Sequence, residues 1–232
     1  MRKGFTLVEL SIVLVIIGLL IGGILVAQSM ISTTKTLVIV RQLSQYDIAI
    51  SNFIYKYNQL PGDSNMFSDP GNNDKQTDPS GYETGNAWEH LSQGVGLKNA
   101  FGQDYVGFNP FFATTEATCP ILKMNTNPAA TNLCLTINFD WEDSGGGEYQ
   151  FRADIPSQQQ VHAALLPKDL LALDVKIDDG LPSTGGVGFV DWGGIFSTCD
   201  AGGNKYNASS TSYVCTPMIW IGLANGVNAN NH

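Results

Sequence analysis

The N-terminus of the chain contains one long apolar run. From Leu10 to Ala27 every residue except Ser11 is apolar or glycine, and two basic residues lie close to the start of the chain. At the rise of an α-helix, the stretch from Phe5 to Ala27 is about 34 Å long, which is enough to cross the hydrocarbon core of a bilayer. The run therefore predicts a membrane-spanning helix.

A single acid, Glu9, interrupts this apolar stretch. A carboxylate at that depth costs roughly 2.5–3.5 kcal/mol, so it needs a partner. Cleavage between Gly4 and Phe5 would create a positive α-amine four residues before Glu9. On a neighbouring copy of the chain, that amine would neutralise the carboxylate. Phe5 and Glu9 are therefore the candidate assembly residues.

Residues 3–10, Lys-Gly-Phe-Thr-Leu-Val-Glu-Leu, resemble the class III signal of type IV pilins and of type II secretion pseudopilins. The resemblance implies cleavage after Gly4 by a prepilin peptidase, N-methylation of Phe5, and retention of the apolar helix as the spine of a filament. The partners it implies are other pilin subunits, the prepilin peptidase, an inner-membrane assembly platform and membrane lipid. The segments 60–63, 88–91 and 178–182 resemble a pilin-like subgroup.

An ordinary secretory signal peptide is the alternative interpretation. Leu25-Val26-Ala27 before Gln28 is an acceptable small-residue cleavage site. The very short basic segment and the acid within the apolar region argue against it. Basic residues before the run place the N-terminus in the cytoplasm. We therefore expect a single-pass protein of the bacterial inner membrane, with its head in the periplasm and later in a filament.

Beyond the apolar run, the hydrophobic residues become periodic. They recur at spacings of three and four, as in one stripe of an α-helix: Ile39, Leu43, Tyr46, Ile50, Phe53 and Tyr57. This pattern predicts three parts: a leader at 1–4, a long helix at 5–57 whose segment 5–28 is transmembrane, and a globular head at 58–232. The fold class expected is α+β and type IV pilin-like, with an antiparallel sheet in the head.

The head is expected to contain short helices and strands. Helical spacing covers 86–97, and Pro167 would begin another helix after a first one capped by Ser157. Alternating residues over 133–141 and 148–153, joined by Gly145-Gly146-Gly147, predict a hairpin. Short strands are expected at 187–192 and 213–222, the latter an edge strand or a bulge because of Pro217.

The charge and the cysteines restrict the function. The net charge of −9 argues against broad nucleic-acid binding, which needs clustered Lys and Arg. Four cysteines allow three pairings, and the sequential one closes two short loops. A zinc site is the alternative, but the sequence has no C-x-x-C spacing and its histidines are scattered. The cysteines in question are Cys119, Cys134, Cys199 and Cys215.

Two acidic segments are candidate metal sites. The loop from Asp63 to Gly85 is rich in Asp and Asn, which supply the hard oxygen ligands that calcium takes, although the spacing is not that of an EF-hand. Asp178 and Asp179 precede a glycine, which suits a tight turn and could also hold a cation. Calcium is thus the candidate cofactor at Asp178, Asp179 and Asp63, and a solvated turn is the alternative.

The sequence shows no catalytic motif, and no enzymatic activity is expected. The function predicted is a structural subunit, a pilin or pseudopilin, of a type IV filament. A minor or tip subunit whose head binds a surface, a sugar or another ligand is the alternative. A membrane-anchored enzyme is a third class, and it would require the head alone to turn over a substrate.

Overall fold

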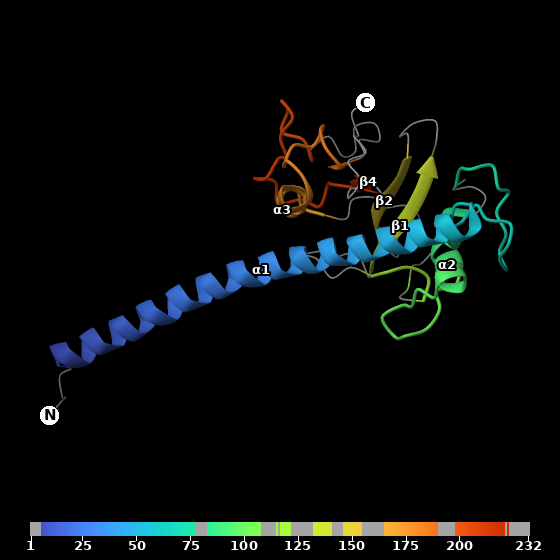
Figure 1. Cartoon of the computed structure of the whole chain (residues 1–232). Coiled ribbons are helices and arrows are strands. Elements are labelled where there is room, and N and C mark those ends of the chain that lie inside the picture. Colours follow the sequence, from blue (N-terminus) through green and yellow to red (C-terminus); the bar gives the residue numbers. More distant parts are fainter. Residues whose placement is uncertain are drawn as a thin grey trace.

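The computed structural model describes residues 6–77, 83–107, 115, 117–121, 132–140, 146–154, 165–189, 198–220 and 222. Figure 1 shows a long helix that projects from a head, with the N-terminus at its far end. The fold is α+β and pilin-like, as predicted. The described elements are, in chain order, α1 (Leu7–Tyr57), α2 (Glu83–Val95), β1 (Asn132–Asp140), β2 (Gly146–Asp154), α3 (Pro167–Ile177), β3 (Val187–Phe189) and β4 (Pro217–Trp220).

The helix α1 ends at a left-handed residue. Asn58 has a φ of 53°, and its N–H donates to the carbonyl of Ile54 at 2.8 Å. The last helical residue is Tyr57, as the predicted helix 5–57 has it. Gly62, which also has a positive φ, lies in the turn that follows. Asn can terminate a helix because it tolerates the left-handed region better than most residues.

The C-terminal half of α1 carries the head. The predicted stripe from Ile39 to Phe53 is buried, and this half packs on α2 and α3. Phe53 is fully buried against the rings of Phe67 and His90. Across the same core, Trp88 of α2 donates its indole N–H to the carbonyl of Leu135 at 2.7 Å. The stripe therefore joins α1 to the sheet through α2.

The sheet has the strand order β1-β2-β4-β3, and all its pairings are antiparallel. The predicted hairpin is present as β1 and β2, with Leu135 opposite Phe151 and Ile137 opposite Tyr149. The expectation that Pro217 marks an edge strand is wrong, because β4 lies between β2 and β3. The alternative, a bulge, is wrong as well, because β4 pairs residue for residue with both neighbours. Pro217 is the first residue of β4, a position where the missing N–H is tolerated.

Other predicted boundaries shift by a few residues. Helix α2 begins at Glu83, three residues before the predicted start, and α3 continues from Pro167 through Asp174 to Ile177. Strand β3 is described only to Phe189, so the rest of the predicted strand 187–192 lies outside the described residues. The short helix expected after Ser157 also lies outside them.

Candidate functional site

The start of α1 is organised around Glu9. Thr6 is the N-cap, and its hydroxyl accepts a hydrogen bond from the Glu9 N–H at 3.3 Å. The Glu9 carboxylate in turn accepts from the Thr6 N–H and hydroxyl, both at 2.8 Å. These reciprocal bonds form a capping box, which satisfies backbone donors at the first turn. Within one chain, the acid in the apolar run is therefore the residue that closes the helix start.

Sequence analysis identified Glu9 but missed Thr6. The signal was present, because Thr followed three residues later by Glu before an apolar run is the capping-box pattern. The predicted processing residues Gly4 and Phe5 lie outside the described residues. Of the assembly pair, the structure therefore places only Glu9, and it places that side chain at an exposed position.

The apolar run that follows is exposed along its whole length. The most hydrophobic 18-residue window of α1 has a mean hydropathy of 3.0 and is wholly exposed, and α1 is long and apolar enough to cross a membrane. A Cβ added at Gly18, Gly22 or Gly23 would meet no atom within 4 Å. Glycines on such a helix allow another helix to approach closely.

One acidic cluster lies at the end of α3. Asp174, Asp178 and Asp179 each place an oxygen within 4.8 Å of the others. Asp174 is buried, and it accepts hydrogen bonds from the Tyr206 hydroxyl at 2.7 Å and the Gly180 N–H at 3.1 Å. Burial raises the pKa of Asp174 to about 6, although the Tyr206 hydrogen bond opposes this shift.

The two predicted ligands in this cluster also hold a turn. Asp179 accepts from the Leu181 N–H at 2.8 Å and from the Thr184 hydroxyl at 2.7 Å. Asp178 accepts from the Gly186 N–H. These bonds are those of the turn interpretation, and each carboxylate oxygen keeps a further lone pair that a cation could use. The calcium prediction at Asp178 and Asp179 stays a prediction.

The third predicted ligand, Asp63, belongs to a different cluster. Its oxygens lie within 4.8 Å of those of Asp74 and Glu83. Asp63 is buried, and it accepts from the N–H groups of Asp74 at 3.0 Å and Lys75 at 2.8 Å. Burial raises its pKa, and the backbone hydrogen bonds oppose this shift. Asp63 therefore orders the loop that follows α1, and the structure does not bring it together with Asp178 and Asp179.

The head is cross-linked by two disulfides. Cys119 is bonded to Cys134, with their Cα atoms 5.8 Å apart, and Cys199 to Cys215, with theirs 5.2 Å apart. This is the sequential pairing, and it leaves no thiolate for the alternative zinc site. In the chain-entropy model each short loop contributes about 3 kcal/mol.

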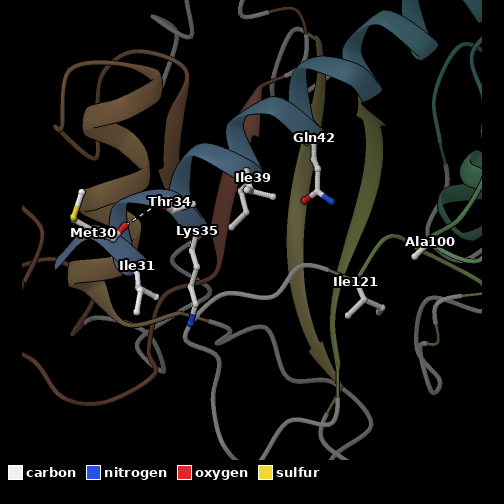
Figure 2. A pocket seen from close by; sticks show the side chains of 9 residues that line it. Met30, Ile31, Thr34, Lys35, Ile39, Gln42, Ala100 and Ile121 are labelled. Carbon is white, nitrogen blue, oxygen red and sulfur yellow. Dashed lines mark hydrogen bonds between the residues drawn. The ribbon is translucent and has the colours of Figure 1, made fainter. Parts of the chain in front are cut away.

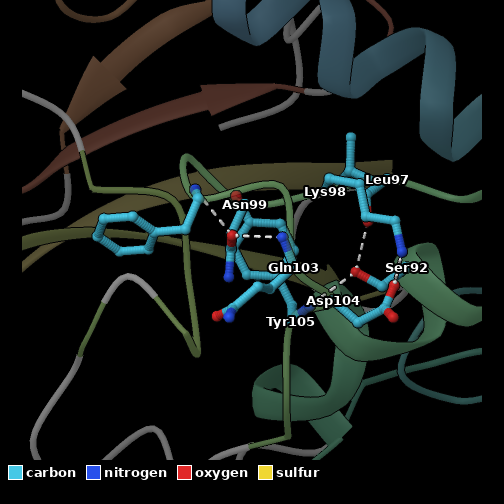
Figure 3. Close-up of polar contacts among 8 residues, drawn as sticks. Ser92, Leu97, Lys98, Asn99, Gln103, Asp104 and Tyr105 are labelled. Atoms are coloured by element: carbon cyan, nitrogen blue, oxygen red, sulfur yellow. Dashed lines mark hydrogen bonds and ion pairs between the residues drawn. The ribbon is translucent and has the colours of Figure 1, made fainter.

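The segment 97–105 forms a braced loop (Figure 3). The Asn99 side chain accepts from the N–H groups of Phe101 at 2.9 Å and Gln103 at 3.0 Å. Lys98 forms an ion pair with Asp104 across the loop. Phe101 is 71% exposed. The sequence left this region open between a packed loop and a contact surface, and its described part presents one exposed aromatic on a fixed backbone.

Comparison with known proteins places a family signal on the start of the chain. Residues 1–25 match the family model described as the prokaryotic N-terminal methylation motif. This is the signal of type IV pilins and pseudopilins, and it identifies a pilin-like substrate of prepilin peptidase. It also implies a membrane-anchored bacterial protein that assembles with other pilin subunits. No curated protein and no solved structure matches the chain.

Proposed function

We propose that this protein is a structural subunit, a pilin or pseudopilin, of a type IV filament. The observation that carries the proposal is the methylation motif at residues 1–25, which continues directly into a helix with two different halves. Prepilin peptidase cleaves between Gly4 and Phe5, Phe5 is N-methylated, and the apolar half of α1 is retained. The motif indicates a structural role, and we propose no catalytic activity.

Before assembly, the subunit is held in the inner membrane by the apolar half of α1. Basic residues on the N-terminal side of such a run stay in the cytoplasm, which places the head in the periplasm. An inner-membrane assembly platform then transfers the helix from lipid into a bundle with other subunits. The exposed apolar side chains are covered by lipid in the first state and by neighbouring helices in the second.

Glu9 sets the register between neighbouring subunits. Its carboxylate pairs with the methylated α-amine of Phe5 on an adjacent copy while it keeps the capping box with Thr6. Both are compatible because a carboxylate offers about four lone-pair positions. Removal of one partner from such a desolvated pair costs about 3–5 kcal/mol, so a subunit without the acid is expected to join filaments poorly.

Two substitutions separate the charge of Glu9 from its role in the cap. Glu9→Ala removes both, whereas Glu9→Gln removes the charge and retains a capping-box residue. We expect both variants to remain in the membrane fraction and to give little filament in a shearing assay. Ser11→Ala, which removes a neutral polar group from the same run, should assemble normally. Wild-type filament yield from Glu9→Gln would contradict the ion pair and leave Glu9 only the cap.

A minor or tip subunit is the second candidate function. The exposed Phe101 on its braced loop favours it, because rigid aromatic side chains are common anchors in binding surfaces. Immunogold labelling of sheared filaments separates the candidates. A structural subunit labels along the whole filament, and a tip subunit labels only one end.

A further inference from the structure

A pocket of about 590 Å³ lies where α1 enters the head. We call it the neck pocket. Its α1 side is lined by Met30, Ile31, Val38 and Ile39, with Lys35 among them. Figure 2 shows Ala100 and Ile121 across from this face of α1. Thr34 and Gln42 also line it, so the pocket is a mainly apolar groove with two neutral polar side chains and one cationic side chain.

The position of the neck pocket relative to the membrane follows from the position of the apolar run. Its first lining residue, Met30, follows the end of the run at Ala27 by three positions, and Lys35 by eight. Lys35 thus lies about 12 Å beyond the run along the helix axis. The headgroup layer extends roughly 5–8 Å beyond the hydrocarbon core, and a lysine side chain reaches back toward it by snorkelling. In the membrane state of the proposed function, the end of the pocket at Met30 and Ile31 lies at headgroup level, and Lys35 reaches toward that level from the aqueous side.

Lys35 is available to an anion. In the sequence it is the first basic residue after Lys3, on a chain whose net charge is −9. Within the described residues, no carboxylate lies within 4 Å of its amine. Asp169 of α3 is close enough for the lysine charge to influence its carboxyl, but it does not line the pocket.

We infer that the neck pocket holds a membrane phospholipid, with its phosphate on Lys35 and the start of an acyl chain against the apolar side chains of α1. This inference rests on the membrane residence proposed above. A phospholipid supplies both an anion and apolar surface to the pocket. The helix of a second copy fits less well, because Glu9 is the one acid in residues 5–34 and the proposed function pairs it with the α-amine of Phe5.

The test uses photocrosslinking of the full chain in vesicles of phosphatidylethanolamine and phosphatidylglycerol. The photoreactive residue p-benzoylphenylalanine replaces Val38, which lines the pocket, or Leu37, which does not. The two positions are matched, because they differ by about 1.5 Å in height and are 46% and 41% exposed. A lipid bound in the pocket gives phospholipid adducts at Val38 well in excess of those at Leu37, identified by mass spectrometry.

Lysine variants then test the phosphate contact. With the probe at Val38, Lys35→Gln should lower the lipid adduct about five-fold, the factor associated with one lysine near an anionic surface. Lys35→Arg should retain the adduct, and so should Lys205→Gln in the Cys199–Cys215 loop, because Lys205 does not line the pocket. The bulky probe itself can block the pocket, so the comparison is repeated without it. Here the phospholipid retained on the purified protein is measured for the wild type and for Lys35→Gln.

Three results would overturn the inference. If Leu37 and Val38 gave equal lipid adducts, the lipid would not be bound specifically in the pocket. The same conclusion would follow if Lys35→Gln lost no lipid by either measurement. Adducts at Val38 to a second copy of the chain would make the pocket a subunit contact. A probe at Leu14, inside the apolar run, reports membrane residence separately. Absence of lipid adducts there would overturn the proposed membrane state, whereas lipid at Leu14 without lipid at Val38 overturns only this inference.

Discussion

The two halves of α1 belong to one continuous helix but meet different surroundings. In the first half, large apolar side chains are exposed, from 45% at Ile17 to 85% at Leu7. In the second half, the stripe from Ile39 to Phe53 is at most 8% exposed. A helix that is apolar all round needs apolar surroundings on every side, whereas a helix with one stripe needs a single partner. The difference separates the part that enters a membrane or filament from the part that carries the head.

The largest effect is expected from a matched pair of side-chain truncations, one in each half of α1. Phe53→Ala removes a fully buried ring that packs on Phe67 and His90, and it should lower the free energy of unfolding of the head by about 3–5 kcal/mol. Leu14→Ala removes an exposed side chain of the first half and should leave that free energy unchanged. Denaturant unfolding of the full chain in detergent, followed by tryptophan fluorescence, measures both. A loss in Leu14→Ala similar to that in Phe53→Ala would break the division of the helix.

A second test uses pH, because the most strongly shifted carboxyl of the described head belongs to Asp174 on α3, which packs on α1. Burial raises its pKa from 3.8 to about 6. The folded state therefore binds the proton more tightly than the unfolded state, and this contribution is complete below pH 3.8 and is lost as the pH rises through about 6. In EDTA, Asp174→Asn should flatten this part of the dependence of the unfolding midpoint on pH. If the unfolding midpoint of Asp174→Asn still depended on pH as that of the wild type does, groups other than Asp174 would be responsible for the dependence.

The same pH titration with added calcium tests the cation hypothesis for Asp178 and Asp179. A bound cation stabilises the folded state by mass action and neutralises the crowded carboxylates. Calcium should therefore raise the wild-type midpoint by a few degrees above pH 6 and leave Asp178→Asn unmoved. Identical midpoints in calcium and in EDTA would mean that these acids serve only the turn.

The smallest expected effect lies at the start of the apolar half. Thr6→Ala removes the hydroxyl that accepts the Glu9 N–H, and such a cap contributes about 1 kcal/mol. Amide hydrogen exchange in micelles should show a faster Glu9 amide in Thr6→Ala, and Thr6→Ser should retain the wild-type rate. The stability of the head should not change in either variant. If the Glu9 amide exchanged at the same rate in Thr6→Ala as in Thr6→Ser, the capping box would not be formed in solution.

The sequence predicts the regular parts of this molecule well. The apolar run and the stripe that follows it define α1 because both depend on local periodicity, and the hairpin follows from alternation of apolar residues. The position of β4 between β2 and β3 could not be predicted, because strand order depends on contacts between distant segments. The end of α1 at Tyr57 agrees with the prediction, whereas the left-handed cap at Asn58 was not predicted, because a left-handed Asn is a less common signal than a left-handed Gly.

The candidate sites were predictable to different extents. Glu9 is identifiable because an acid within an apolar run is costly. Asp178 and Asp179 were found from their adjacency, but Asp174 was not joined to them because it lies inside α3 and meets them only when the chain turns. The neck pocket has no sequence signal, since it is formed by α1 and two separate segments of the head.

The most direct test of the central claim is the mature N-terminus of the protein, determined by mass spectrometry after purification from its native membrane. Retention of α1 as a membrane and filament helix predicts a chain that begins at N-methylated Phe5. A chain that begins at Gln28 would show that the apolar half is removed as a secretory signal peptide. That result would contradict the filament role, the pairing of Glu9 and the lipid site together.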